Sequence, residues 1–113
     1  DFGDLIGGES RTGCCSNAVR GVIGAGSPAT DRISFVTMAS LGNALDFGNS
    51  TNSSEGKAGM NSPTRGIWGG SDDDNTNTIE YVQIMTTGNA YDFGDLAVSK
   101  RQVSGSSNGH GGL

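Results

Sequence analysis

The stretch ISFVTMASLGNALDFG, residues 33–48, recurs as IEYVQIMTTGNAYDFG at residues 79–94. Each copy has a run in which apolar and polar residues alternate, then a Gly-Asn-Ala segment, then Asp-Phe-Gly. Alternation with period two indicates a β-strand, and Gly and Asn allow the backbone to reverse tightly. The stretch therefore predicts a strand, a turn and a further strand that begins at Asp-Phe-Gly, and it predicts this arrangement twice.

The repeat extends along the whole chain. RGVIGAG at residues 20–26 matches RGIWGGS at 65–71, and the DFGDL that opens the chain returns at 92–96. Short apolar runs that end in glycine fit buried strands, and TGCCSN at residues 12–17 is a candidate for a fourth strand of the unit. We expect a single repeat domain over residues 1–113. Its units are residues 1–45, residues 46–91 and a partial unit at residues 92–113.

Composition favours an all-β protein. Of 113 residues, 33% are apolar and 20 are glycine, and no run is rich enough in strong helix formers to give an amphipathic helix. The net charge is −5 without a basic cluster, so we expect no nucleic-acid partner. No apolar run reaches the ~18 residues of a membrane span, so we expect no membrane insertion.

Each unit resembles a blade of a kelch-type β-propeller. It has a glycine-ended strand, a loop, an alternating strand, a Gly-Asn-Ala turn and an outer strand, in that order. Unit length agrees, since kelch repeats run to about 50 residues. RGVIGAG together with GNALDFG is further similar to the kelch-like repeats in virion structural and tail-fibre proteins of marine cyanobacterial phages. The resemblance implies a non-enzymatic structural or adhesive module of a phage virion appendage, in the virion or outside the cell. The alternative is a bacterial kelch-like propeller that binds other proteins.

About two and a half blades cannot close a propeller ring, because each blade packs on a neighbour. The expected partners are therefore copies of the chain itself or the remaining repeats of a longer chain, and a β-solenoid or fibre is the alternative architecture. Other virion proteins are further expected partners. A host-surface glycan or protein would be recognised by the loops SPATDR (27–32) and SDDDNTN (71–77), which differ most between copies.

The repeated motif residues are predicted to be structural. Asp-Phe-Gly is not a kinase motif here, because no phosphate-binding loop or His-Arg-Asp loop accompanies it, and no catalytic set is recognisable. Its aspartates should cap turns, its phenylalanines should insert between blades, and its glycines should permit close backbone approach. The two repeated arginines are expected to pair with an Asp-Phe-Gly aspartate of an adjacent blade, or alternatively to contact a ligand. These residues are Asp1, Phe2, Gly3, Arg20, Gly21, Asp46, Phe47, Gly48, Arg65, Gly66, Asp92, Phe93 and Gly94.

One acidic cluster offers ligands for a cation. Asp72, Asp73 and Asp74 supply the hard oxygen atoms that Ca²⁺ prefers, but the spacing of a dedicated calcium loop is missing. The two interpretations are a weak calcium site and a solvated hairpin loop. No other cofactor is expected.

Several single residues are expected to be structural as well. Adjacent Cys14 and Cys15 should be free thiols, with one side chain facing in and the other facing out. Trp68 is expected in the core, with sugar stacking as the alternative, and His110 is expected in a turn. Ser50 replaces the leucine of the other copies of the motif, which leaves the packing of that segment open.

Overall fold

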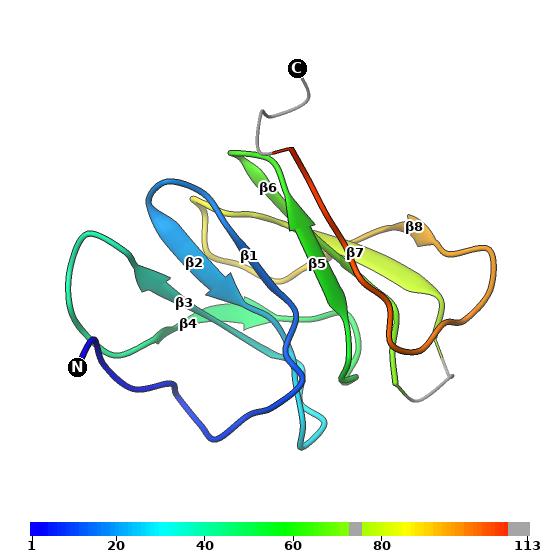
Figure 1. Ribbon diagram of the computed structural model, residues 1–113, viewed down its shortest axis with the longest axis horizontal. Helices are drawn as coiled ribbons and strands as arrows, with labels where there is room; N and C mark the ends of the chain where they lie inside the picture. Colours follow the sequence, from blue (N-terminus) through cyan, green and yellow to red (C-terminus); the bar gives the residue numbers. More distant parts are fainter. Residues whose placement is uncertain (73–75, 109–113) are drawn as a thin grey trace.

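The computed structural model describes residues 1–72 and 76–108, and these contain eight β-strands and no helix. The strands form two antiparallel sheets of four strands each, which confirms the all-β prediction (Figure 1). The first sheet consists of β1 (Cys14–Ser16), β2 (Arg20–Ile23), β3 (Arg32–Thr37) and β4 (Leu45–Asn49). The second consists of β5 (Ala58–Asn61), β6 (Arg65–Gly69), β7 (Thr78–Gln83) and β8 (Tyr91–Asp95).

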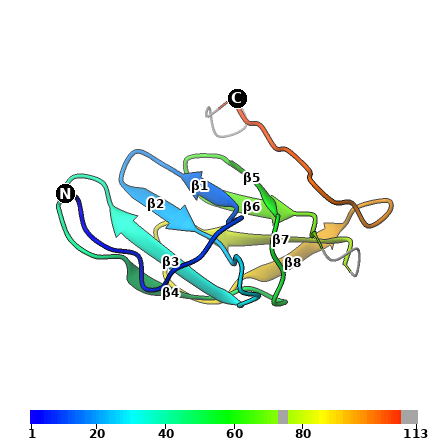
Figure 2. The same cartoon turned by 60° about the horizontal axis from the view of Figure 1, so that its bottom comes forward.

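In each sheet the strands lie in chain order, so every connection is a hairpin between neighbours (Figure 2). The predicted fourth strand is present as β1 and β5. The Asp-Phe-Gly motif forms the last strand of each sheet, which confirms the outer strand expected after the Gly-Asn-Ala turn. Its backbone pairs with the alternating strand before it.

A β-bulge marks the Asp-Phe-Gly motif in both sheets. Ile33 pairs with Gly48 while Ser34 pairs with Asp46, so Phe47 is an extra residue on β4. Phe93 is the extra residue at the same place on β8. A bulge redirects a side chain out of the regular alternation. The glycine that follows each extra phenylalanine has a positive φ, 147° at Gly48, which explains why the motif requires glycine there.

The two sheets pack face to face, and the two faces in contact are different ones. We define the front face of a sheet as the side that carries Cys15, Val22 and Phe35 in the first sheet, which the strand register places together. The back face is the opposite side, which carries Trp68 and Val82 in the second sheet. These five side chains belong to one buried cluster, so the front face of the first sheet packs on the back face of the second.

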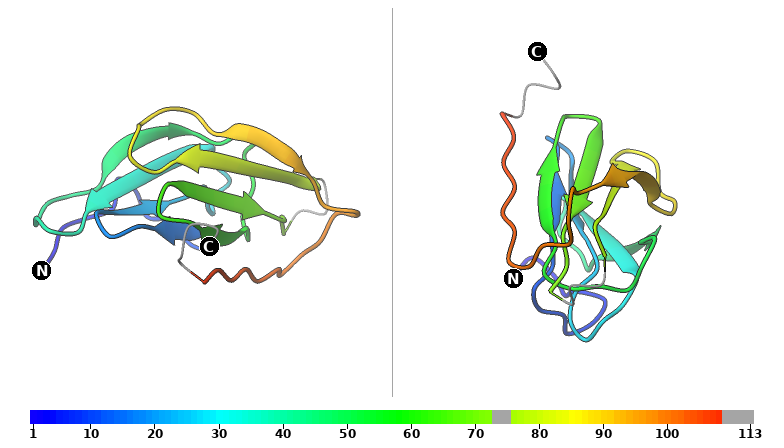
Figure 3. Two further views of the ribbon diagram at one scale, coloured as in Figure 1. Left: turned by 90° about the horizontal axis from the view of Figure 1, so that it is seen from above. Right: turned by 90° about the vertical axis from the view of Figure 1, so that its right-hand side faces the viewer.

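The described part of the chain continues the repeat beyond the second sheet. Arg11, Gly56 and Gln102 occupy equivalent positions of successive units, and all three have a positive φ. The segment 97–108, the red end of the trace in Figure 3, runs along the outer side of β5. There Gly105 lies beside the carbonyl group of Gly59, much as Gly59 lies beside the carbonyl group of Cys14. The segment therefore continues the third, partial unit.

Candidate functional site

The junction between the two sheets contains most of the residues that the sequence singled out. At its centre lies the Trp68 ring, which is 1% exposed and donates a hydrogen bond from Nε1 to the carbonyl oxygen of Gly13 at 3.0 Å. A Cβ at Gly24 would lie only 2.9 Å from the same carbonyl oxygen and 3.1 Å from the Trp68 ring. The predicted core role of Trp68 is confirmed, and the buried ring is not available for stacking on a sugar.

The Asp-Phe-Gly strand of the first sheet binds the Gly-Asn-Ala turn of the second sheet. The amide of Gly88 donates to the carbonyl oxygen of Phe47 at 2.7 Å, and that of Ala90 donates to the carbonyl oxygen of Asn49 at 2.8 Å. The Asn89 side chain accepts a hydrogen bond from the Asn49 amide at 3.0 Å. We call these three hydrogen bonds the turn latch.

The same latch occurs a second time, at the N-terminal copy of the motif. Phe2 and Asp4 accept hydrogen bonds from the amides of Gly42 and Ala44, and Asn43 accepts one from the Asp4 amide. A Cβ at Gly3 or at Gly48 would overlap the carbonyl group of the turn that lies on it. The glycine of Asp-Phe-Gly therefore permits the close backbone approach that its type and position predict.

Each Asp-Phe-Gly aspartate caps its own turn. Asp1, Asp46 and Asp92 accept a hydrogen bond from the amide two residues later, at 3.2, 3.2 and 2.8 Å respectively. Phe47 lies between the sheets at 3% exposure, whereas Phe93 is 52% exposed. The carboxylates are thus engaged locally, as expected from side chains that favour turns.

The repeated arginines do not pair with these aspartates, which corrects the prediction. The Arg20 guanidinium lies 4.5 Å from the centre of the Phe35 ring, and Phe35 meets Phe47 edge to face at 5.9 Å. In the second sheet Arg65 stacks on Tyr81 at 4.7 Å. The face of an aromatic ring attracts a cation. Arg20 lies two residues before Val22, so its side chain is on the front face of the sheet together with Phe35. Arg20 also donates to the carbonyl oxygen of Ile84, the residue directly after β7, at 3.1 Å.

The glycines after these arginines make room for the neighbouring sheet. Gly66 is buried, and a Cβ there would overlap the Sγ atom of Cys15. Gly21 occupies the same position in the first sheet and is half-buried. A side chain at Gly66 would push the two sheets apart.

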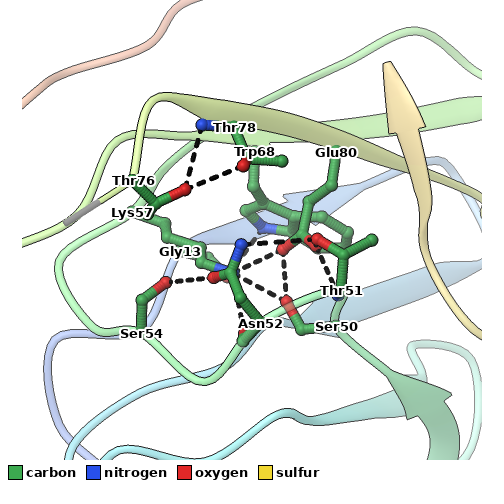
Figure 4. A network of polar contacts seen from close by, with 10 residues as sticks. All are labelled: Gly13, Ser50, Thr51, Asn52, Ser54, Lys57, Trp68, Thr76, Thr78 and Glu80. Carbon is green, nitrogen blue, oxygen red and sulfur yellow. Dashed lines mark hydrogen bonds and ion pairs between the residues drawn. The ribbon is translucent and has the colours of Figure 1, made fainter. Parts of the chain in front are cut away.

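A buried ion pair, which the sequence did not predict, closes one end of the junction (Figure 4). Lys57 Nζ lies 2.5 Å from Glu80 Oε1, and the two side chains are 4% and 3% exposed. Lys57 Nζ also donates to Ser50 Oγ at 2.7 Å, and Ser50 Oγ in turn donates to Glu80 Oε1. The amide and the hydroxyl of Thr51 donate to the second carboxylate oxygen, both at 2.7 Å. Both oxygens of the carboxylate therefore have partners.

Burial by itself raises the pKa of Glu80. The Lys57 ammonium and the hydrogen bonds from Lys57, Ser50 and Thr51 act against burial and bring the pKa below its ordinary value. Glu80 is therefore ionised at neutral pH and forms a true ion pair with Lys57.

A signal for this ion pair was present in the sequence. Ser50 breaks the leucine pattern of the motif, and Glu80 is the one charged residue in the alternating run 79–85. The equivalent of Glu80 in the first sheet is Ser34, and the equivalent of Lys57 in the third unit is Val103. Ser50 and Lys57 precede Glu80 by 30 and 23 residues but meet it in space, so only together do these three departures from the repeat indicate an ion pair.

The two cysteines are free thiols, with Cys14 exposed and Cys15 buried, as predicted. Burial, with a smaller contribution from Cys14, raises the pKa of the Cys15 thiol to about 12. The thiolate is the reactive form of cysteine, so Cys15 is unreactive in the folded protein.

Only one member of the acidic cluster lies within the described residues. Asp72 Oδ2 accepts a hydrogen bond from Arg11 at 3.3 Å, and Glu55 accepts one from the same guanidinium nitrogen at 3.2 Å. Asp73, Asp74 and His110 lie outside the described residues, so the calcium site and the turn role of His110 stay predictions. Within residues 1–72 and 76–108, no three acidic, histidine or cysteine side chains are grouped to hold a metal ion.

No protein-family model matches the chain, and no curated protein sequence is significantly similar to it. Among the described residues there is no helix long and apolar enough to cross a membrane. Function is therefore inferred from the junction and from the repeat.

Proposed function

We propose that the chain is a non-enzymatic structural module whose two sheets are blades of a kelch-like β-propeller, and that it belongs to an appendage of a phage virion. The observation that carries the proposal is the directional junction: the front face of one sheet packs on the back face of the next, and the turn latch accompanies this contact. A contact of this kind uses two different surfaces, so it can repeat around a ring or along a fibre.

The polar groups of the junction support a structural role. The Lys57 and Glu80 side chains satisfy each other away from solvent, and the Asp-Phe-Gly carboxylates cap their own turns. Polar groups whose partners lie inside the module fit a structural role.

Adhesion would use the loops between the second and third strands of each sheet. Residues 24–31 join β2 to β3, and residues 70–77 join β6 to β7, so the two loops leave their sheets at equivalent ends. They differ in charge, and the alignment of the repeats gains one residue there, while the strands around them are alike. Variable loops on a repeated rigid scaffold are where a host-surface glycan or protein would be recognised.

The adhesive role can be tested by measuring how the purified protein binds to a glycan array and to bacterial envelope fractions. A variant in which Pro28, Ala29 and Thr30 become Gly-Ser-Gly should lose binding, since these residues form the tip of the first loop. A matched control changes the exposed Ser106 and Ser107 to Gly and should bind normally. If the wild-type protein binds no glycan and no envelope fraction, the adhesive part is wrong and a scaffolding role remains.

The virion assignment needs a separate experiment. An antibody against the chain should label tail or fibre structures of intact phage particles in electron micrographs. Labelling confined to uninfected bacterial cells would instead favour a bacterial propeller that binds other proteins.

A further inference from the structure

The front face of the second sheet is open, whereas the equivalent face of the first sheet is covered. Phe47 is 3% exposed and its equivalent Phe93 is 52% exposed; Cys15 is 5% exposed and its equivalent Met60 is 37% exposed. The open face contains an apolar groove of about 400 Å³. Its lining includes Met60, Ile67, Ile79, Phe93, Leu96 and Val103.

At the edge of the same sheet, the Asp-Phe-Gly motif of β8 has no Gly-Asn-Ala turn bound to it within the described residues. A Cβ at Gly3 or Gly48 would strike the Gly-Asn-Ala turn that lies on it, while a Cβ at Gly94 would have no atom within 4 Å. Gly94 keeps the positive φ of its equivalents, 143° against 151° and 147°. The third Asp-Phe-Gly motif therefore has the backbone shape that binds a turn in the two other copies.

The back face of the first sheet has the apolar positions that would cover such a groove. Ile23 corresponds to Trp68, and Val36 corresponds to Val82, in the alignment of the two repeats. Ile23 and Val36 are only half-buried in this chain and line a hollow of about 270 Å³. The chain thus carries both halves of one junction, on opposite ends.

We propose that the front face of the second sheet binds the back face of the first sheet of a second copy of this chain, with Asp92–Asp95 latched onto the turn at residues 42–44 of that copy. The contact is head to tail, so it leads to rings or fibres. It uses the same geometry as the junction inside the chain, and it does not depend on the virion role.

Two segments must give way when this contact forms. Residues 1–5 already lie on the turn at 42–44, but they have the same sequence as residues 92–96, DFGDL. Residues 92–95 belong to a strand of the second sheet, whereas residues 1–5 belong to no strand. On the other side of the contact, β1 of the second copy displaces residues 104–108, which also belong to no strand. Residues 92–95 thus replace residues 1–5, and β1 replaces residues 104–108. In each case the incoming segment is a strand of a sheet and the displaced segment is not.

Sedimentation velocity of the full chain over a range of concentrations tests this proposal. We expect the mass of the wild-type protein to rise with concentration in multiples of 11.5 kDa. Gly94→Ala should reduce this association at least tenfold, because its methyl group would strike the incoming turn. The matched control is Gly88→Ala, which places alanine at a positive φ of 156° with open space around its Cβ; it should associate as the wild type does.

A second pair of variants covers the case in which Gly94→Ala does not fold. Met60→Glu puts a charge into the groove at a side chain that is 37% exposed, and it should abolish association. Met85→Glu puts the same charge on a side chain that is 50% exposed and does not line the groove, and it should have no effect. A wild-type protein that stays monomeric at all concentrations overturns the proposal. So does a Gly94→Ala or Met60→Glu variant that is folded by circular dichroism and associates as the wild type does.

Discussion

Removing the cation of the buried ion pair should destabilise the protein strongly. Lys57→Met keeps most of the volume and the apolar stem of the side chain but leaves the Glu80 carboxylate, 3% exposed, without its countercharge. Breaking a buried pair in this way costs about 3–5 kcal/mol, because an uncompensated charge remains in the interior. Since a domain of this size is stable by only about 5–15 kcal/mol, the loss is a large part of the total.

Urea unfolding followed by the fluorescence of Trp68 measures this effect. Trp68 is the only tryptophan and it lies buried in the same junction, so its emission reports directly on the separation of the sheets. With a slope of about 1.5 kcal/mol per molar urea, a loss of about 3–5 kcal/mol lowers the unfolding midpoint by about 2–3 M. The exposed Lys100 provides the control, and Lys100→Met should change the midpoint very little.

The double variant Lys57→Met with Glu80→Gln separates charge from packing. The neutral amide that replaces the Glu80 carboxylate can still accept hydrogen bonds from Thr51 but no longer needs a countercharge. The stability of the double variant should return to within about 2 kcal/mol of the wild type. A cost of less than about 1 kcal/mol for Lys57→Met, which is the range of an exposed pair, would contradict a buried ion pair at this place. A double variant no more stable than Lys57→Met would contradict it equally.

Three further measurements test the pH dependence of the ion pair, the cysteines and the turn latch. The pKa of Glu80 is lower in the folded protein than in the unfolded chain, so its contribution to stability should be complete above about pH 5. This contribution should be lost as the pH falls further, because the unfolded chain takes up the proton first. Glu80→Gln should remove this part of the acid sensitivity in pH-dependent urea unfolding. A thiol reagent at about pH 8 should modify Cys14 rapidly and Cys15 only after unfolding, since burial raises the pKa of Cys15 to about 12; rapid modification of two thiols in the native protein would contradict this. Gly48→Ala should be at least about 2 kcal/mol less stable than Gly88→Ala in urea, because both place alanine at a positive φ but only the first meets a backbone carbonyl group; equal stabilities would show that the turn latch yields without cost.

Local sequence was enough to predict the strands, the turns and the period. Alternation over residues 33–39 and 79–85, and glycine at the turns, depend on local backbone preferences, and these act in the same way wherever the segment lies. The capping role of Asp46 and the one-in, one-out arrangement of Cys14 and Cys15 are likewise properties of short segments, and they could be predicted without knowing the neighbours.

The way in which the two sheets contact each other follows from the tertiary structure. From the sequence, the partner of the Arg20 guanidinium could be an aspartate or an aromatic ring. Which of the two it contacts depends on the side chains that share its face once the sheet is formed. Lys57 and Glu80 lie 23 residues apart and come together only because Ser50 and the second sheet close around them. Contacts of this kind depend on the relative placement of whole elements, which a repeat pattern does not contain. The same pattern allows two sheets, a ring or a fibre, and the choice among them depends on which face is covered and which is left open.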